Sequence, residues 1–403
     1  MNKNINLGIF GFGVVGQGLF HVLSETKGIK AEILKICIKH PEKKRILNKR
    51  MFTTNKFEIL DDDNVNVVVE LIDDHVAAYD IVKYALKKGK SVVTANKRMI
   101  AENIEELYNL QKENKGNLLY EGACCASIPI IRNLEEYYDN DLVNAVEGIF
   151  NGSTNFILTK MAEKGISFRS ALQETQEKGF AESDPIMDVG GFDSKFKLSI
   201  ILAHSFGIFA KPESIFNYGI DHLSEFDFRL AREKGYKIKL KGICRKSNGK
   251  VFAMIAPQFI DQDNKLYQVN DEYNGVVVEG AFSENQYFIG KGAGGYPTGS
   301  AVLSDISALT YGYRYEYKKL LQKLNLQLGF DFKFELYVRW NGDEINKEDF
   351  ETISEEYRNS ENSYIIGTIN FKKLLNSSWI NRNDISIILT NNSEFRSITC
   401  NNE

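Results

Sequence analysis

The feature that most constrains the fold is a glycine-rich turn near the start of the chain, between an apolar run and an amphipathic segment. Residues 4–10 form a short apolar run typical of a buried strand, and apolar residues recur at helical spacing over residues 14–24. Between them the chain reads Gly11-Phe12-Gly13-Val14-Val15-Gly16, a GxGxxG sequence. In a strand–turn–helix unit these glycines allow a tight turn, a close approach of the backbone to a diphosphate, and close packing of helix on strand. The sequence therefore predicts a dinucleotide held by residues 11–16 at the N-terminus of the first helix, where free N–H groups favour an anion.

The first third of the chain repeats the order of strand, then helix. We expect strands at 33–38, 67–71 and 91–94, and an amphipathic helix at 80–88 that ends at Gly89. Because parallel strands joined through helices are connected by right-handed crossovers, this alternation predicts a Rossmann-type, doubly wound parallel sheet.

The end of the second predicted strand bears on the choice of coenzyme. In such sheets an acidic residue at this point binds the ribose 2′-hydroxyl of NAD, whereas a basic residue accommodates the 2′-phosphate of NADP. Here one acid, Glu42, stands among five basic residues: Lys39, His40, Lys43, Lys44 and Arg45. The group predicts a preference for NADP(H), with Lys39 as the first contact and NAD(H) still possible. For any single residue, a solvated charged surface is the alternative interpretation.

Composition excludes several classes of function. The 403 residues suffice for two or three domains, and a formal net charge of −4 gives no electrostatic footprint for nucleic acid. No apolar stretch approaches a membrane span, and the opening MNKNINLGIF leads into the first strand without the pattern of a signal peptide. With no CxxC pair and no metal-like spacing, the cysteines predict reduced, mostly buried thiols in a cytoplasmic protein. They are Cys37, Cys124, Cys125, Cys244 and Cys400.

Five motifs follow one another along the chain. They are Thr94-Ala95-Asn96-Lys97, then YEGACCASIPII at 120–131, GIFNGSTNFIL at 148–158, the segment 179–197 that begins GFAESDP, and GKGAGGYPT at 290–298. In this order and spacing the chain closely resembles the homoserine dehydrogenases over about residues 5–315, and the segment 179–197 is the most specific part of the resemblance.

The resemblance implies an architecture and a reaction. The expected parts are a Rossmann-type dinucleotide-binding domain at 1–130, completed by about 295–320, an α+β catalytic and dimerisation domain at 131–294, and a small C-terminal module at 331–403. The family interconverts L-homoserine and L-aspartate 4-semialdehyde with NAD(P), in threonine, methionine and isoleucine biosynthesis. A homodimer or homotetramer that acts on a small amino-acid substrate, without nucleic acid or membrane, is therefore expected.

Two lysines carry the expected proton chemistry. The aldehyde oxygen gains negative charge during reduction, so the site needs a proton donor and cationic stabilisation. By resemblance, Lys197 is the general acid and Lys97 is a second lysine beside the substrate and the coenzyme. A lysine whose pKa is lowered by burial or by another cation suits such a role.

An acidic segment is expected to recognise the substrate. Carboxylates bind an α-ammonium group through charge-assisted hydrogen bonds, and by resemblance Glu182 and Asp193 contact the amino acid while Asp188 supports them. Asp193 and Lys197 are four residues apart, so on a helix they share a face. The alternatives are an exposed ion pair among solvated acids, or a divalent-cation site.

Two further loops complete the expected site. By resemblance, Asn151, Gly152 and Ser153 lie beside the nicotinamide and the substrate, and the coenzyme packs against Gly294. The segment 121–128 resembles a site for a monovalent cation, Na⁺ or K⁺. Its ligands would be the Glu121 carboxylate and the carbonyl groups of Cys124, Ala126 and Ile128. The alternative is a connection whose carbonyl groups are bonded internally.

Two regions depart from the family pattern. After the third strand the chain has Asp73-Asp74-His75, where relatives have glycines or a small hydroxyl residue. Asp73 is among the expected coenzyme contacts, and two carboxylates beside a diphosphate would repel it. Either the loop points them to solvent, or the affinity for the coenzyme is reduced, or the specificity has drifted. At the C-terminus, predicted strands at 334–338 and 385–389 around a helix at 347–357 suggest a degenerate α+β module resembling the ACT domain. Feedback control is not supported, because residues 340–344 replace the turn that usually marks effector binding.

Three functions therefore remain open at the level of sequence. The first is an NADP(H)-preferring homoserine dehydrogenase. The second, favoured by Asp73-Asp74, is a related dehydrogenase with another small amino-alcohol substrate. The third is a non-enzymatic nucleotide-binding sensor. The presence of both lysines argues against the sensor, because a binding protein needs no proton donor.

Overall fold

The computed structural model describes residues 5–140, 142–390 and 396–397. The chain forms two compact units, the first made of Met1–Asp139 with Gly290–Lys318, and the second of Asn140–Ile289 with Lys319–Glu403. None of the helices in the described chain combines the length and apolar character that a membrane crossing requires.

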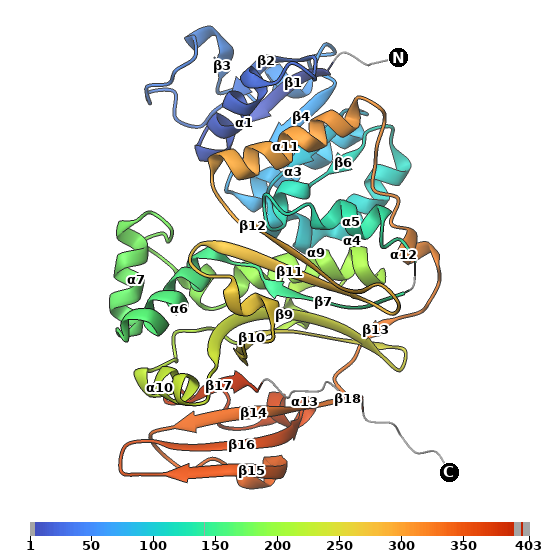
Figure 1. The fold of residues 1–403 in the computed structure, drawn as a ribbon. Helices are drawn as coiled ribbons and strands as arrows, with labels where there is room; N and C mark the ends of the chain where they lie inside the picture. The colour runs from blue at the N-terminus through green and yellow to red at the C-terminus, as the bar shows by residue number, and fades with distance from the viewer. Residues whose placement is uncertain (1–4, 141, 391–395, 398–403) are drawn as a thin grey trace. The chain divides into compact units, whose positions relative to one another are not determined.

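The first unit is built on a six-stranded parallel sheet with the order β3-β2-β1-β4-β5-β6 (Figure 1). Its strands are β1 (Ile5–Phe10), β2 (Ala31–Cys37), β3 (Phe52–Thr53), β4 (Val67–Glu70), β5 (Ser91–Thr94) and β6 (Leu118–Leu119). The strand order reverses direction at β1, as in a doubly wound sheet, and every strand pair is parallel. The predicted Rossmann-type sheet is confirmed.

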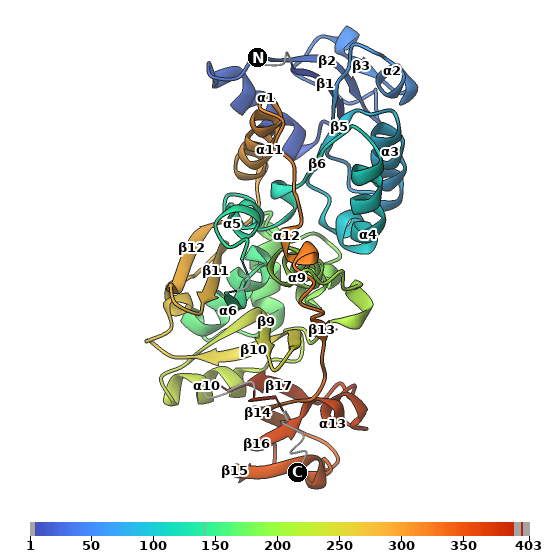
Figure 2. The same cartoon turned by 90° about the vertical axis from the view of Figure 1, so that its right-hand side faces the viewer.

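Helices cover both faces of this sheet. They are α1 (Val14–Glu25), α2 (Phe57–Leu60), α3 (His75–Lys87), α4 (Lys97–Glu113), α5 (Ile130–Glu136) and α11 (Gly295–Leu309), with the 3₁₀ helices η1 (Lys49–Met51) and η2 (Glu121–Ala123). Figure 2 shows α1 and α11 on one side of the sheet and α3 and α4 on the other. Since both faces are covered, the strands are buried runs of apolar residues, as in β4, where Val67, Val68 and Val69 are almost fully buried.

The helices α1 and α11 cross at glycines. A Cβ atom on Gly18 would lie 2.0 Å from the carbonyl oxygen of Gly295, and one on Gly299 would lie 2.6 Å from the amide nitrogen of Leu19. Because backbone atoms cannot give way as flexible side chains do, the crossing requires these small residues.

We predict that Gly18→Ala destabilises the protein by about 1–3 kcal/mol, the usual cost of overpacking a tight contact, although alanine favours the helix intrinsically. Gly28→Ala is the matched control, because a Cβ atom at Gly28 meets no atom within 4 Å. Thermal and urea unfolding of both variants measure the difference. Equal free energies of unfolding for the two variants would show that α1 and α11 can move apart without loss of stability.

The second unit is built on a mixed sheet with the order β12-β11-β7-β9-β10-β17-β14-β16-β15, to which β8, β13 and β18 add short pairings. Its strands are β7 (Val143–Ile149), β8 (Phe216–Asn217), β9 (Lys237–Ser247), β10 (Lys250–Ile260), β11 (Tyr273–Gly280), β12 (Glu284–Lys291), β13 (Gln327–Leu328), β14 (Phe332–Trp340), β15 (Phe350–Arg358), β16 (Ser363–Asn370), β17 (Ser386–Leu389) and β18 (Arg396–Ser397). Its helices are α6 (Gly152–Lys164), α7 (Phe168–Glu177), α8 (Ile186–Val189), α9 (Phe192–Phe206), α10 (Glu225–Glu233), α12 (Lys318–Leu321) and α13 (Phe371–Asn376), with η3 (Pro212–Ser214), η4 (Lys265–Gln268) and η5 (Lys347–Asp349). The prediction of a separate α+β region is confirmed.

The C-terminal residues extend this sheet. The strands predicted at 334–338 and 385–389 are β14 and β17, but the helix predicted at 347–357 is wrong, because the structure has η5 followed by strand β15. Within the described chain β15 pairs only with β16, as the last strand of the sheet, and most of its side chains are exposed. An exposed edge strand lacks the alternation of apolar and polar residues that marks a half-buried strand, so its charged sequence suggested a solvated helix.

This C-terminal region shares its hydrophobic core with the rest of the second unit. One buried cluster joins Phe252 and Met254 of β10 to Phe334 of β14 and Phe371 of α13. The ACT-like assignment is not confirmed.

Buried polar contacts also connect α10 to the C-terminal strands. The Asp227 carboxylate accepts hydrogen bonds from Arg339 Nε at 2.8 Å, from the Tyr337 hydroxyl at 2.7 Å and from Ser386 Oγ at 3.2 Å. Arg339 and Asp227 form an ion pair in which both side chains are almost completely buried. The shared core and this ion pair make the C-terminal strands an integral part of the second unit.

The cysteines agree with the expectation of mostly buried thiols. Cys124, Cys125 and Cys244 are buried and Cys37 is half-buried. Burial raises the pKa of the Cys244 thiol to about 12, which makes it a poor nucleophile. Cys400 lies outside the described residues.

Candidate active site

A buried ion pair on α9 lies at the centre of the candidate site. The helix starts after Gly191, whose φ of +80° is left-handed, and nearly all of its side chains are buried. Lys197 Nζ donates hydrogen bonds to Asp193 Oδ2 at 2.7 Å and to the Phe150 carbonyl oxygen at 2.6 Å. Lys197 is 6% exposed and Asp193 is 4% exposed. The alternative of a solvated surface pair therefore does not describe these residues.

Asn151 connects this pair to a second acid. Its Nδ2 atom donates to Asp188 Oδ1 at 2.7 Å and to Asp193 Oδ2 at 2.9 Å. Its Oδ1 atom accepts the Thr154 N–H at 2.8 Å and caps α6. The structure thus brings together four of the predicted site residues: Asn151, Asp188, Asp193 and Lys197.

The arrangement provides a proton donor beside a fixed negative charge. Burying two charges costs several kcal/mol per ion unless hydrogen bonds compensate, and here Asp193 Oδ2 accepts from both Lys197 and Asn151. A lysine ammonium held in this way can donate a proton to a substrate oxygen and stabilise the negative charge that develops on it.

Asn274 is a functional candidate that sequence reasoning missed. It is completely buried on β11, and its Nδ2 atom donates to the same Phe150 carbonyl oxygen as Lys197, at 2.9 Å. Its Oδ1 atom has no hydrogen-bond partner among the described residues. The signal in the sequence is a single polar residue just before the valines of β11, which is no motif by itself.

Two predicted residues shape the loop around this cluster. A Cβ atom on Gly152 would lie 2.5 Å from the Glu272 carbonyl oxygen, so no larger residue fits there without movement. Ser153 Oγ donates to the Phe180 carbonyl oxygen and fastens the loop that leads to Glu182. Glu182 itself is exposed, and its carboxylate forms no hydrogen bond or ion pair with a residue that the structure describes. The structure therefore does not bring Glu182 into the cluster.

The glycine-rich turn of the first unit has the geometry that an anion site needs. Gly11 has a φ of +93° and donates its N–H to the Cys37 carbonyl oxygen at 2.9 Å. A Cβ atom on Gly11 would lie 2.5 Å from the Leu71 carbonyl oxygen, and one on Gly16 would lie 2.6 Å from the Gly11 carbonyl oxygen. A Cβ atom on Gly13, by contrast, would meet nothing within 4 Å, and no side chain caps the N-terminus of α1. The first N–H groups of α1 thus remain available for a phosphate.

Of the two acidic residues after β4, Asp73 and Asp74, the second has a structural role. Asp74 caps α3, because its Oδ1 atom accepts the N–H groups of Val76 at 3.0 Å and Ala77 at 3.1 Å. The hydrogen bonds from Ala77 and Val76 hold the pKa of the Asp74 carboxyl below its usual range. This cap also starts α3 before the helix predicted from residue 80. Asp73 remains exposed in the same loop.

Glu70 is a second residue that sequence reasoning missed. It is fully buried at the end of β4, where it accepts the Ile72 N–H at 2.7 Å and the Thr94 hydroxyl. Asn96 Nδ2 donates to the Ile72 carbonyl oxygen at 3.0 Å, and the Asn96 side chain caps α4, which begins with half-buried Lys97. Glu70 therefore ties the loop of Asp73 to the segment that presents Lys97.

The basic group after β2 is at the surface. Lys39, Lys43 and Lys44 are exposed. Arg45 donates to the His40 carbonyl oxygen at 2.7 Å and to that of Lys43 at 2.8 Å, so it holds the loop in shape.

The segment predicted to hold a monovalent cation surrounds a buried carboxylate. Glu121 accepts the N–H groups of Ile131 at 2.8 Å and Arg132 at 2.9 Å, at the start of α5. Burial, together with the neighbouring Asp305, raises the pKa of Glu121 to about 8. Two consecutive residues, Cys125 and Ala126, have left-handed φ values of 54° and 40°.

Two predicted residues, Ile128 and Gly294, complete the description of these loops. The carbonyl oxygen of Ile128 accepts the Ile130 N–H at 2.8 Å. Gly294, predicted to contact the coenzyme, has a φ of +115° and caps α11. In the described chain no three His, Cys, Asp or Glu side chains are grouped as metal ligands.

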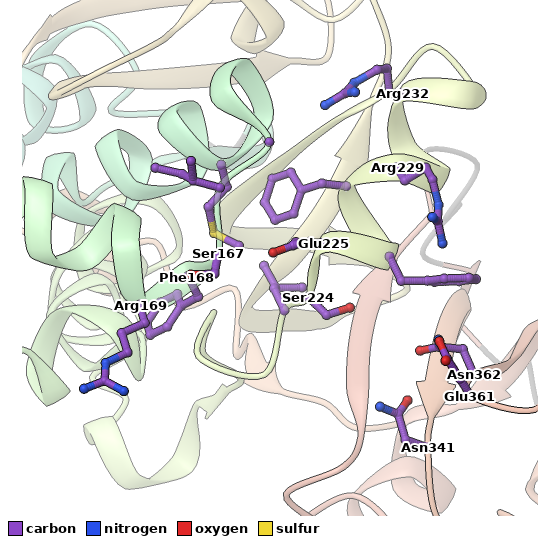
Figure 3. Close-up of a pocket in the computed structure, with 16 residues that line it drawn as sticks. Ser167, Phe168, Arg169, Ser224, Glu225, Arg229, Arg232, Asn341, Glu361 and Asn362 are labelled. Carbon is purple, nitrogen blue, oxygen red and sulfur yellow. The ribbon is translucent and has the colours of Figure 1, made fainter.

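A cavity of about 770 Å³ lies elsewhere in the second unit (Figure 3). It is lined by the segment 165–169, by α10 and by residues 341 and 361–362, and by none of the predicted site residues. Its three arginines, Arg169, Arg229 and Arg232, lie at separate points of its rim and do not converge.

We predict that Glu70→Gln flattens the pH dependence of stability. Burial raises the pKa of Glu70 from 4.5 to about 7. The folded chain therefore keeps a proton that the unfolded chain has lost, and this contribution to stability disappears as the pH rises from 4.5 through 7. Between about pH 5 and pH 8 the wild type should lose about 3 kcal/mol relative to the variant, as measured by urea unfolding. Parallel stability curves for the two proteins would contradict the assignment of a protonated Glu70.

Two family models match the chain. One described as homoserine dehydrogenase matches residues 129–307, and one described as homoserine dehydrogenase, NAD binding domain, matches residues 11–121. The homoserine dehydrogenase of Bacillus subtilis is 34% identical over 321 residues, which are 77% of this chain and 74% of that protein. The homoserine dehydrogenase of Lactococcus lactis is 35% identical over 313 residues, 75% of this chain and 73% of that protein.

Solved structures give the same result. The crystal structure of a homoserine dehydrogenase from Thiobacillus denitrificans matches with a TM-score of 0.86 and 28% identity, over 96% of this chain and 98% of that chain. A hyperthermophilic archaeal homoserine dehydrogenase in complex with NADPH matches with a TM-score of 0.67 and 27% identity, over 78% of this chain and 99% of that chain.

Proposed function

The chain belongs to the homoserine dehydrogenase family of oxidoreductases, and we propose that it interconverts L-homoserine and L-aspartate 4-semialdehyde with NADP(H) as its preferred coenzyme. The observation that carries the proposal is the buried Asp193–Lys197 ion pair, joined to Asp188 by Asn151. It supplies a proton donor and carboxylates for an ammonium group within one cluster.

Lys197 is the proposed proton donor and acceptor. In the reducing direction its ammonium donates a proton to the aldehyde oxygen, and in the oxidising direction its neutral amine takes the hydroxyl proton of homoserine. The coenzyme, when bound, supplies or accepts the hydride. The Phe150 carbonyl and Asp193 fix the direction of the lysine side chain, so it is already oriented before the substrate arrives.

The carboxylates are proposed to bind the substrate ammonium. Asp193 lies in the cluster, and Asp188 supports it through the shared partner Asn151. Glu182, on the loop fastened by Ser153, is proposed as the second carboxylate for the ammonium group. Gly152 and Ser153 are proposed to lie beside the substrate and the nicotinamide. Lys97 keeps its predicted role as a second lysine beside substrate and coenzyme.

The preference for NADP(H) rests on the first unit. The exposed residues Lys39, His40, Lys43 and Lys44 follow the carboxyl end of β2, where a Rossmann sheet places the adenosine ribose. One relative of known structure is a complex with NADPH. Gly11–Gly16 and the open side of Gly13 would hold the diphosphate, and Gly294 would pack against the coenzyme.

We further propose a structural Na⁺ or K⁺ ion on the segment 121–128. Left-handed backbone at two adjacent non-glycine residues is uncommon and needs support. The Glu121 carboxylate would add lone pairs that its two backbone hydrogen bonds leave available, and the carbonyls of Cys124, Ala126 and Ile128 would complete the set. No step of the reaction passes through this ion.

Assembly and location complete the proposal. We propose a homodimer or homotetramer whose contact includes β12, the edge strand of the second sheet, where Tyr287 and Ile289 are 43% and 56% exposed and Phe282 in the preceding turn is 87% exposed. The functional division into 1–130 with 295–320, 131–294 and 331–403 remains part of the proposal. So do a cytoplasmic location and a place in threonine, methionine and isoleucine biosynthesis.

The two alternative functions have less support than the proposed one. The case for another amino-alcohol substrate rested on the acidic pair after β4, and Asp74 of that pair caps a helix. A sensor without activity has no use for the buried lysine of the cluster. The direct test of the function is reduced-nicotinamide absorbance with L-homoserine and either NADP⁺ or NAD⁺, in which no homoserine-dependent signal with either coenzyme would refute it.

Lys197→Ala is expected to lower kcat by about 100- to 10,000-fold, the range for loss of a general acid or base. The affinity for NADP(H) should change little, because the glycine-rich turn is untouched. Lys195→Ala is the control, since Lys195 lies on the same helix with its Nζ over the Phe192 ring at 4.8 Å. Steady-state kinetics and coenzyme fluorescence titration measure both effects. A variant that keeps wild-type kcat would remove Lys197 from the mechanism.

Lys39→Asp is expected to narrow the preference for NADP(H) over NAD(H) in kcat/KM. Lysine acts on a phosphate as a point charge, so the wild-type preference should be moderate and should fall as salt screens it. Lys30→Asp, an exposed lysine just before the amino end of β2, is the matched control and should leave the preference unchanged. A wild-type enzyme that works better with NAD(H) at every ionic strength would overturn the assignment.

A further inference from the structure

One buried lysine of the second unit has no carboxylate partner among the residues that the structure describes. Lys239 on β9 is 1% exposed. Its Nζ atom donates to the Val269 carbonyl oxygen at 2.6 Å, to Asn155 Oδ1 at 2.9 Å and to Asn270 Oδ1 at 3.3 Å. An ammonium has three N–H groups, so these three acceptors match the charged form.

Keeping this cation inside the protein is costly. Burial and the neighbouring Lys237 lower the pKa of Lys239 to about 7, against the opposing charges of Asp271 and Glu163. A buried charge without a counter-ion is tolerated only where hydrogen bonds replace its hydration. The three acceptors come from two different segments, so the lysine holds those segments together.

One of these segments is the first turn of α6. Asn155, which accepts from Lys239, donates its Nδ2 atom to the carbonyl oxygens of Val269 at 3.1 Å and Tyr273 at 3.0 Å. It is 1% exposed. Lys239 and Asn155 therefore bind the segment 269–273 to α6 through a closed set of buried hydrogen bonds.

The same turn carries the residues of the proposed site. The Asn155 N–H donates to the Asn151 carbonyl oxygen at 3.2 Å, and Asn151 is the residue that bonds Asp188 and Asp193. Gly152 packs closely on Glu272, which lies in the segment 269–273. A Cβ atom on Gly152 would lie 2.5 Å from the Glu272 carbonyl oxygen. A shift of the segment would thus move the start of α6.

We propose that Lys239 is a positioning residue of the active site. Through Asn155 it fixes the first turn of α6, and so holds Asn151 where that residue orients the carboxylates of Asp188 and Asp193. Lys239 itself touches neither substrate nor coenzyme. The inference rests on the proposed function, because those carboxylates are taken to bind the substrate ammonium.

The neighbouring Lys241 offers a matched control. It lies two residues further along β9, is also 1% exposed, and forms an ion pair with Glu147 at 3.0 Å. Lys241→Met should therefore cost stability as Lys239→Met does, but among the described residues Lys241 forms no hydrogen bond or ion pair with α6 or with the segment 269–273.

The kinetic test compares the effect of each substitution on the KM for homoserine with its effect on the KM for NADP(H). In Lys239→Met the KM for homoserine should rise about tenfold, as expected for the loss of a well-placed charged hydrogen bond, while the KM for NADP(H) stays within about twofold. Lys241→Met should change neither constant beyond that range. If Lys239 acts through Asn151, then Lys239→Met should raise KM much less in an Asn151→Ala background.

Amide hydrogen exchange tests the positioning role of Lys239 without relying on enzyme activity, so its failure can be distinguished from failure of the proposed function. Amide hydrogen exchange of residues 152–156 should speed up about tenfold in Lys239→Met relative to Lys241→Met, whether or not homoserine is the substrate. If Lys239→Met does not fold, Lys239→Gln, which keeps a donor, gives the same comparison. Unchanged exchange in α6, or equal effects of the two lysine variants on the KM for homoserine, would overturn the positioning role.

Discussion

The oxygen atom Asp193 Oδ2 is the point on which the site of the second unit depends. It accepts one hydrogen bond from the Lys197 ammonium and one from the Asn151 amide, inside a region with almost no exposure to solvent. Loss of either partner would remove one of the hydrogen bonds that compensate for the burial of this carboxylate. Through Asn151 the constraint extends to Asp188 and to the start of α6. The positions of the proposed catalytic groups therefore depend on the position of the first turn of α6.

Buried polar groups play a comparable part in the first unit. Glu70 joins the loop after β4 to the segment before α4, and Glu121 caps α5 while its own N–H donates to Asp305 at 2.8 Å. Burial raises the pKa of both glutamates into the neutral range. Hydrogen bonds to these two buried carboxylates therefore hold the loops around them in place.

Local patterns predicted much of this structure. The GxGxxG turn, the alternation of strand and helix, and the spacing of Asp193 and Lys197 are short-range signals, and each has a direct geometric meaning. Asn274, Lys239 and Glu70 could not be found in this way. A single polar residue such as Glu70 at the end of an apolar strand is no motif, and the alternating lysines of β9 have the pattern of a strand with one face in solvent. The same limit applies to β15, whose exposed edge position removes the alternation that identifies a strand. The two carboxylates after β4 looked alike in sequence, and only the helix cap distinguishes Asp74 from Asp73.

The most direct test of the central claim is a crystal structure of the protein with L-homoserine and NADP⁺. We predict that the homoserine hydroxyl oxygen lies within about 3 Å of Lys197 Nζ, the distance required for proton transfer, with the ammonium group against the carboxylates of the acidic segment. Homoserine bound with its hydroxyl away from Lys197, for example in the cavity of Figure 3, would contradict it.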